Sequence, residues 1–343
     1  IQPSGKESTV TMNGRKASCS IRDLARYVGL STCTVSKVLN NRSDFKIQEE
    51  TRQRVLEAAR TLNYVPNVNA QRLFQKKSGI IGLLIPSQTD GDNAFADNHF
   101  VNMLAGLERP LLESGYNLLL QFNDPELKKE SRYLNLFRAG SLDGLLIWGA
   151  HRSDRCYEEL IAYGAPHLFI TSFPHRDSDE AISFVTADYR ENSEQMTRDL
   201  IADGARSILY LAGPEENSVV ELMTAGIEAG IRGTAATLFT THGLFSQNDT
   251  YRQVLRQAAS REFDSIISAS ALMAIGASHA LRELGMAPES KRWVLLDSAS
   301  RTEVLPYPHR RALMNDQRIG SEAISGLIDL IEGRCARVRK TVP

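Results

Sequence analysis

Apolar positions divide the chain into a short helical region at the front and a long region where strands and helices alternate. Between residues 20 and 62 the apolar positions recur every three or four residues, which predicts three short helices: 20–28, 32–39 and 48–62. The positions expected to be buried in them are Leu24, Ala25, Val28, Val35, Val38, Leu39, Val55, Leu56, Ala59 and Leu62.

Local signals fix where the first two of these helices begin and end. Ser20 to Asp23 has the form of a capping box, in which the first and fourth residues satisfy the amides of a helix start. Gly29 suits the tight bend that ends the first helix, and Ser31 suits the N-cap of the second. The second helix is short and leaves a polar face outward. A glycine-containing turn before such a helix is typical of a helix-turn-helix DNA-binding domain.

After Gly79 the pattern indicates an α/β fold, with doubly wound parallel sheets in two lobes. Helices are expected in 100–113, 127–138, 192–202, 271–284 and 319–331. Strands are expected in 80–85, 117–121, 144–148, 167–171, 184–186, 207–212, 265–268 and 293–296. Ligands of such folds bind beyond the carboxyl ends of the strands, in the cleft between lobes.

Charge separates the same two regions. Residues 15–77 carry thirteen Lys or Arg and five Asp or Glu, a balance of +8, so with a net charge of −1 the remainder carries −9. A basic front segment on an acidic body suggests a polyanionic partner for the front segment only, although a solvated basic surface would have the same charge. Together with the helix-turn-helix pattern, the charge favours double-stranded DNA as the partner.

Other features exclude several classes of protein. Cys19, Cys33, Cys156 and Cys335 show no metal-binding spacing, and we expect reduced thiols, no metal and no cofactor. The first thirteen residues lack the apolar centre of a signal peptide, and no run of about eighteen apolar residues occurs. A cytoplasmic protein without a membrane span is therefore expected. No P-loop, GxSxG, GxGxxG or HExxH motif points to an enzyme.

The stretch SIRDLARYVGLSTCTVSKVLN, residues 20–40, resembles the headpiece signature of the LacI/GalR family of bacterial repressors, as does LNYVPN at 62–67. The resemblance implies that Thr32 and Cys33 read base edges in the major groove. Lys37 stands where the family usually has a base-reading Arg, and lysine lacks the bidentate fork. The further DNA contacts expected in the headpiece are Ser20, Arg22, Ser31, Thr34, Ser36 and Asn40.

The segment after Pro66 is a linker or the first turn of a core helix when it is considered alone. The resemblance implies instead a hinge helix that forms when two subunits meet on operator DNA. Asn67, Ala70 and Leu73 match its Asn-x-x-Ala-x-x-Leu pattern, with Leu73 as the apolar wedge in the minor groove and Arg72 beside the phosphates.

For the remainder, the resemblance implies a core like that of periplasmic binding proteins, crossed three times by the chain, that forms a homodimer or higher assembly mainly through its first lobe. The expected divisions are a flexible tail (1–17), the headpiece (18–66), the hinge (67–78), lobe 1 (79–186 and about 313–331) and lobe 2 (187–312 and 332–343).

The strand ends supply the candidate effector contacts, although any one of them alone is equally well explained as a helix cap or a core aromatic. They are Gln88, Phe100, Trp148, Asp188, Glu221, Phe245, Ser270, Asp297 and Asn315. Ser270-Ala271 and Thr171-Ser172 depart from the polar pairs usual in the family, and Glu221 falls near a usual arginine. Few basic residues converge on the cleft, which favours a sugar or polyol over a phosphorylated effector.

The sequence therefore predicts a DNA-binding transcription regulator, a repressor, controlled by a small carbohydrate effector. A constitutive DNA-binding protein with a degenerate cleft is the alternative that the altered cleft residues keep open. A sugar kinase or hydrolase lacks its motif here. A transport binding protein does not account for the basic headpiece.

Overall fold

A computed structural model describes residues 19–40, 47–66, 77–87, 94–124, 132–152, 156–174, 182–257, 261–298 and 304–343. The chain divides into two compact units, Ile1–Lys77 and Ser78–Pro343, and each is described by itself. The expected flexible tail and residues 67–76 of the expected hinge lie outside the described residues. None of the helices described is long and apolar enough to cross a membrane.

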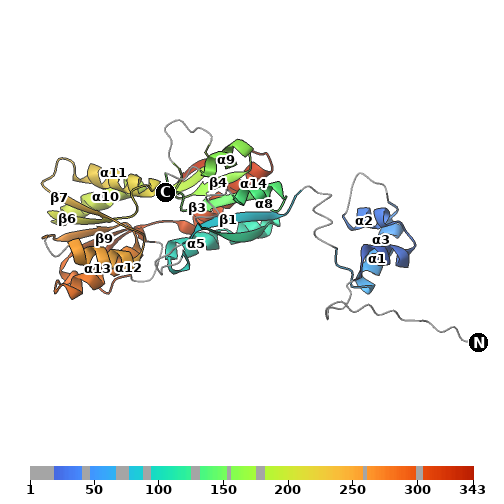
Figure 1. The fold of residues 1–343 in the computed structure, drawn as a ribbon, viewed down its shortest axis with the longest axis horizontal. Coiled ribbons are helices and arrows are strands. Elements are labelled where there is room, and N and C mark those ends of the chain that lie inside the picture. Colours follow the sequence, from blue (N-terminus) through green and yellow to red (C-terminus); the bar gives the residue numbers. More distant parts are fainter. Residues whose placement is uncertain are drawn as a thin grey trace, which may run out of the picture. The chain divides into compact units, whose positions relative to one another are not determined.

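The front unit is the expected three-helix domain, with α1 (Ile21–Val28), α2 (Thr32–Leu39) and α3 (Glu49–Thr61) (Figure 1). Its core is one apolar cluster contributed by all three helices: Leu24, Ala25, Val28, Val35, Val38, Val55 and Ala58. Leu39, Leu56, Ala59 and Leu62 are only partly buried around this cluster. The α3 face therefore centres on Val55 and Ala58 rather than on Ala59.

The second unit contains two parallel sheets, which form its two lobes. The first has the order β11-β5-β4-β3-β1-β2. Its strands are β1 (Ile80–Pro86), β2 (Asn117–Asn123), β3 (Gly144–Trp148), β4 (His167–Ile170), β5 (Phe184–Ala187) and β11 (Arg339–Val342). Its helices are η1 (Ala94–Ala96), α5 (Asn98–Gly106), α6 (Glu108–Ser114), α8 (Arg132–Arg138), α9 (Cys156–Tyr163) and α14 (Asp316–Ile331).

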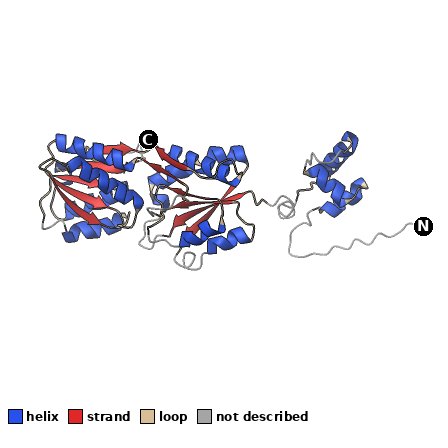
Figure 2. Ribbon diagram, turned by 90° about the horizontal axis from the view of Figure 1, so that it is seen from above, coloured by secondary structure: helices blue, strands red, loops and turns tan. Residues whose placement is uncertain are grey.

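The second sheet has the order β10-β9-β8-β6-β7. Its strands are β6 (Ser207–Ala212), β7 (Thr237–His242), β8 (Ser265–Ser268), β9 (Arg292–Ser298) and β10 (Arg310–Leu313). Its helices are α10 (Tyr189–Ala202), α11 (Ser218–Ile231), α12 (Gln247–Gln257), α13 (Ala271–Glu283) and η3 (Pro288–Ser290). Figure 2 shows helices on both faces of each sheet.

Burial on both faces explains why the central strands are continuous apolar runs. In β3, Leu146 and Trp148 pack into the cluster that contains Phe100 of α5, whereas Leu145 and Ile147 pack into the cluster on the α8 and α9 side. The tightest contact in this lobe is between α5 and α14. A Cβ atom on Gly320 would lie 2.1 Å from the Met103 carbonyl oxygen, so only glycine permits this approach.

The structure corrects three expectations. The helix expected over 100–113 is two helices that meet at Leu107, because Pro110 lacks the amide that would continue the first. Strand β11 pairs with β5, so it belongs to lobe 1, whereas we expected residues 332–343 in lobe 2. The described chain passes between the sheets twice, after β5 and after β10, and not three times.

Candidate functional site

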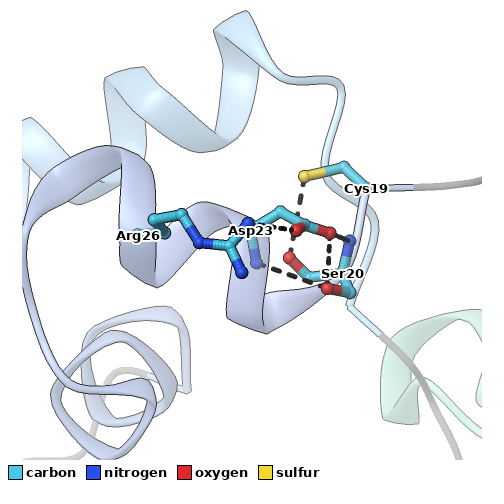
Figure 3. A network of polar contacts seen from close by, with 4 residues as sticks. All are labelled: Cys19, Ser20, Asp23 and Arg26. Carbon is cyan, nitrogen blue, oxygen red and sulfur yellow. Dashed lines mark hydrogen bonds and ion pairs between the residues drawn. The ribbon is translucent and has the colours of Figure 1, made fainter. Parts of the chain in front are cut away.

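The first helix of the headpiece begins with the capping box expected from the sequence (Figure 3). The Ser20 amide donates to the Asp23 carboxylate at 3.0 Å, and the Asp23 amide donates to the Ser20 hydroxyl at 3.3 Å. The Ser20 hydroxyl also donates to this carboxylate at 2.6 Å and holds the pKa of Asp23 below its ordinary value. Arg26 pairs with Asp23 at 3.3 Å, which adds a cation to the exposed end of the network.

The turn that follows has the geometry that a helix-turn-helix domain requires. Gly29 has φ 68° and ψ 33°, in the left-handed region where glycine is favoured, and its amide donates to the Ala25 and Arg26 carbonyls. Ser31 then caps α2 by accepting the Thr34 amide at 3.1 Å. These contacts hold α1 and α2 at a fixed approach and leave the start of α2 accessible.

The start of α2 is exposed. Ser31, Thr32 and Cys33 are exposed, while Thr34, Ser36, Lys37 and Asn40 are half-buried. Two expected phosphate contacts are engaged within the helix, since the Asn40 amide group donates to the Ser36 hydroxyl at 3.2 Å. On α1, Ser20 and Arg22 are exposed as well. Such a helix presents small donors and acceptors of the kind that read base edges in a major groove.

Four of the predicted DNA contacts cannot be placed. Asn67, Ala70, Arg72 and Leu73 lie outside the described residues. Their roles stay predictions.

In the second unit, a cavity of about 220 Å³ lies between the lobes, at the carboxyl ends of the strands. The first lobe lines it with Pro86, Ser87, Asp97, His99, Trp148, Gly149, His151, Thr171 and Ser172. The second lines it with Tyr189, Pro214, Asn217, Val219, Met223, Leu244, Phe245, Ser246 and Ala269. Apolar and aromatic walls with a few polar groups are usual for small-molecule sites.

Two of the nine predicted effector contacts, Trp148 and Phe245, line this cavity. Trp148 packs on the ring of Phe100 with ring centres 4.7 Å apart. Phe100 itself is fully buried and is not in the lining, because its face of α5 points into the core. Phe245 lies over the end of β6, where a Cβ atom on Gly213 would come within 2.4 Å of its ring.

Three other predicted contacts are helix caps. Asp188 caps α10, Ser270 caps α13 and Asn315 caps α14, each accepting a backbone amide of its own helix. None of the three is in the cavity lining, but the neighbours Tyr189 and Ala269 are. In the structure these side chains act as helix caps, and their role as effector contacts stays a prediction.

Glu221 is engaged in an ion pair that joins the lobes. Its carboxylate lies 2.6 Å from the Nε atom of Arg152, which follows β3 in the first lobe. Two backbone donors reinforce the contact: the Arg152 amide bonds the Glu216 carbonyl at 2.8 Å and the Phe173 amide bonds the Ser218 hydroxyl at 3.0 Å. Gln88 and the side chain of Asp297, the last two predicted contacts, lie outside what the structure describes.

Asp97 and His99, which form a polar corner of the cavity, were not predicted from the sequence. Asp97 caps α5 by accepting the His99 amide at 2.9 Å, and burial raises its pKa despite the nearby imidazole. The Nδ1 atom of His99 lies 2.6 Å from the buried carboxylate of Asp316 on α14. We expected the helix to begin only at Phe100, so residues 97–99 were left out of it. Asp97 is a residue type that favours an N-cap, and this signal could have identified the true start of α5.

Thr171 and Ser172, noted in the sequence only as departures, also line the cavity. Thr171 has φ 62°, a conformation that a β-branched residue rarely adopts outside functional or strained positions. The Ser172 hydroxyl is buried with no hydrogen-bond partner among the described residues. The strand end therefore presents uncharged polar groups to the cavity.

Two family models match the chain. The model described as bacterial regulatory proteins, lacI family, matches residues 20–67. The model described as periplasmic binding proteins and sugar binding domain of LacI family matches residues 78–294, which is more than half of the chain. The matches meet close to the boundary between the two structural units.

Individual relatives agree with these matches. The HTH-type transcriptional regulator CelR of Thermobifida fusca is 28% identical over 333 residues, 93% of this chain and 94% of that protein. Catabolite control protein A of Staphylococcus xylosus is 27% identical over 270 residues, 78% of each. Both are regulators matched over most of their length.

Solved structures share the fold. A transcriptional regulator CelR-cellobiose complex has a TM-score of 0.67 at 23% identity, covering 94% of this chain and 96% of that chain. The lac repressor dimer bound to operator and the anti-inducer ONPF has a TM-score of 0.75 at 22% identity, with the same coverage. The chain thus belongs to the LacI family of bacterial regulatory proteins, as a DNA-binding transcription regulator with the family's sugar-binding type of domain.

Proposed function

We propose that the protein is a repressor whose affinity for operator DNA is controlled by a small effector bound in the cavity between the lobes. The observation that carries the proposal is this cavity, which is lined by both lobes and bridged by the Arg152–Glu221 ion pair. A ligand that contacts both lobes stabilises one arrangement of the lobes more than another. A ligand-controlled switch requires such a difference. The similar lac repressor structure is bound to an operator, and the similar CelR structure is a complex with cellobiose.

The DNA side of the proposal rests on the exposed start of α2. Thr32 and Cys33 are exposed there and are the proposed base readers. Two headpieces in a dimer would read a pseudo-palindromic site, because a two-fold protein matches two-fold DNA. Lys37, a little more than one turn along the same helix, is the proposed basic contact.

The dimer is proposed to form between first lobes. Consecutive elements α5, α6 and β2 expose large apolar side chains: Val101, Leu112, Leu119, Leu120 and Phe122. Strand β2 is also an edge strand, and exposed apolar edges are usually covered by a partner. A second copy of this chain is the proposed occupant, and Leu112→Glu with Phe122→Glu should give a monomer in light scattering.

The effector is proposed to be a compound without phosphate. Among the described residues, the cavity lining contains no Lys or Arg. Arg152, the cation at its edge, is paired with Glu221. A phosphate needs charged or bidentate donors, which this lining lacks.

The test selects duplexes from random DNA with the full-length protein and then titrates the selected duplex in cellobiose, sucrose, ribose and their amino-sugar relatives. The proposal expects a two-fold-symmetric site, a steep loss of affinity between roughly 50 and 200 mM salt, and at least one compound that weakens or strengthens binding about tenfold. Salt-independent binding would contradict the DNA role, and operator affinity insensitive to a compound shown to occupy the cavity would indicate a constitutive DNA-binding protein.

A further inference from the structure

The cavity has an acidic corner whose charges are not balanced. Asp97 lines the cavity, and His99 beside it is held by Asp316 at 2.6 Å. With both carboxyls ionised and His99 protonated, the three groups would carry one negative charge in excess. Asp316 has a side chain only 1% exposed, and its second oxygen, Oδ2, has no hydrogen-bond partner among the described residues.

A protonated His99 acts on Asp97 as well as on Asp316, and the described lining has one further histidine, His151. The described lining lacks Lys and Arg, and Arg152 at its edge lies 2.6 Å from Glu221. Helix starts around the cavity could supply positive partial charge, but their own side chains cap them. Asp97 caps α5, Asn217 caps α11 and Asp188 caps α10. An anionic ligand would therefore meet capped helix ends and a carboxyl whose neighbouring imidazole is shared with a second carboxyl, Asp316.

The aromatic walls of the cavity suit a cationic group of a ligand as well as an apolar face of a ligand. The rings of Trp148, Tyr189 and Phe245 line the cavity from three different strand ends. An aromatic face attracts an ammonium group through its quadrupole, most strongly where water is excluded. The polar groups Ser87, Asn217 and Ser246 remain for neutral hydroxyls.

We propose that Asp97 selects an effector that carries a protonated amine, such as an amino sugar or an aminated polyol, with the carboxylate as its counter-ion and the aromatic walls around it. This inference rests on the proposed function, because it names the class of ligand that the interlobe cavity takes. An ammonium–carboxylate hydrogen bond is stronger than one between a hydroxyl and a carboxylate, so the amine is the discriminating group.

The experiment measures ligand affinity of the full-length protein by calorimetry for matched compounds. D-Glucosamine, D-galactosamine, D-mannosamine and 1-amino-1-deoxysorbitol are each compared with the parent compound and, for the amino sugars, with the N-acetyl derivative. At least one amine should bind about tenfold or more tightly than its neutral partners, as expected for a charge-assisted contact in a water-excluded site.

Asp97→Asn tests the residue, because asparagine caps a helix as well as aspartate does while removing the charge. In this variant the preference should fall to within about twofold, and thermal unfolding should show that the fold is kept. Asp188→Asn is the matched control: it removes the acidic cap of α10, a side chain outside the lining, and should keep the preference.

Three results overturn the inference: neutral parents that bind as tightly as the amines, a preference that survives in Asp97→Asn, or no binding of any amine. None of them bears on the proposed function, which is decided by operator affinity with whichever compound occupies the cavity. If operator affinity does not respond to the bound compound while the amine selectivity is present, the proposed function is wrong and the inferred binding site stands.

Discussion

The headpiece and the interlobe cavity place their functional side chains in opposite ways. In the headpiece, neighbouring residues of one eight-residue helix form the exposed face, and the buried cluster behind it is separate. In the cavity, the side chains come from strand ends between Pro86 and Ala269, and many are themselves part of the core. Changes on α2 should therefore act locally on DNA binding, whereas changes around the cavity should act through packing too.

The largest expected effect is in the hinge, which must connect the two regions if they communicate. Leu73→Ala should weaken operator binding by about 2–4 kcal/mol, since unstacking a base step is worth a few kcal/mol. Gel-shift or anisotropy titrations on the selected operator and on random DNA measure it. Affinity for random DNA should stay near wild type; equal losses on both DNAs would mean that Leu73 only stabilises the protein.

The next effect concerns the packed core. Gly320→Ala places a Cβ atom 2.1 Å from the Met103 carbonyl oxygen, and a backbone atom cannot yield as a side chain can. Separating α5 from α14 should lower the free energy of unfolding by about 1–3 kcal/mol. Ser321→Ala, one residue along α14, is the control and should be nearly neutral in denaturant unfolding. Equal stabilities of the two variants would show that the helices do not meet at Gly320.

A smaller effect is expected in the headpiece. Ser20→Ala removes the hydroxyl that accepts the Asp23 amide at the start of α1, and loss of such a cap usually costs about 0.5–2 kcal/mol. Thermal unfolding of the headpiece measures this loss.

Because the pKa of Asp23 is lowered by Ser20, the contribution of this carboxylate to stability persists at neutral pH and is lost as pH falls through the lowered pKa. If the stability difference between wild type and Ser20→Ala stayed the same as the pH is lowered through the pKa of Asp23, this prediction would be contradicted.

The smallest effect is at the cavity edge. Arg152 and Glu221 are 42% and 32% exposed, so their coupling should be only about 0.2–1 kcal/mol. A double-mutant cycle with Arg152→Gln and Glu221→Gln, read out as the free energy of unfolding, separates this coupling from the effects of each side chain. Zero coupling would show that the pair does not join the lobes in solution.

The same contrast explains which features the sequence could predict. Caps, turns and periodicity are local, so α1, α2, Gly29 and Ser31 could be predicted from the residues alone. The central strands could be predicted because both of their faces are buried. The unpredicted strands β7, β10 and β11 are sheet edges, where one side is exposed and polar residues such as Arg339 and Lys340 interrupt the apolar run.

The side chains that line the cavity were harder to predict from the sequence. Near each helix start, the lining residue can be a neighbour of the predicted residue. Asp188 was predicted and Tyr189 lines the cavity; Phe100 was predicted and His99 lines it. In each case a shift of one residue changes a cap or core position into a lining position. The His99–Asp316 contact joins residues 217 positions apart, and nothing in the local pattern of either residue indicates it.

Coupling between the cavity and the headpiece can be measured in two steps. Trp148 lines the cavity, whereas Trp293 is buried in lobe 2 with its indole NH on the Pro288 carbonyl at 2.9 Å, so a change in emission lost in Trp148→Phe reports cavity occupancy. The compound that gives this change at the lowest concentration is then added, at saturation, to an operator titration of the full-length protein. We expect the operator dissociation constant to shift by about tenfold or more, within the range typical of coupling between two sites. Clear occupancy of the cavity with an unchanged operator dissociation constant would contradict the account.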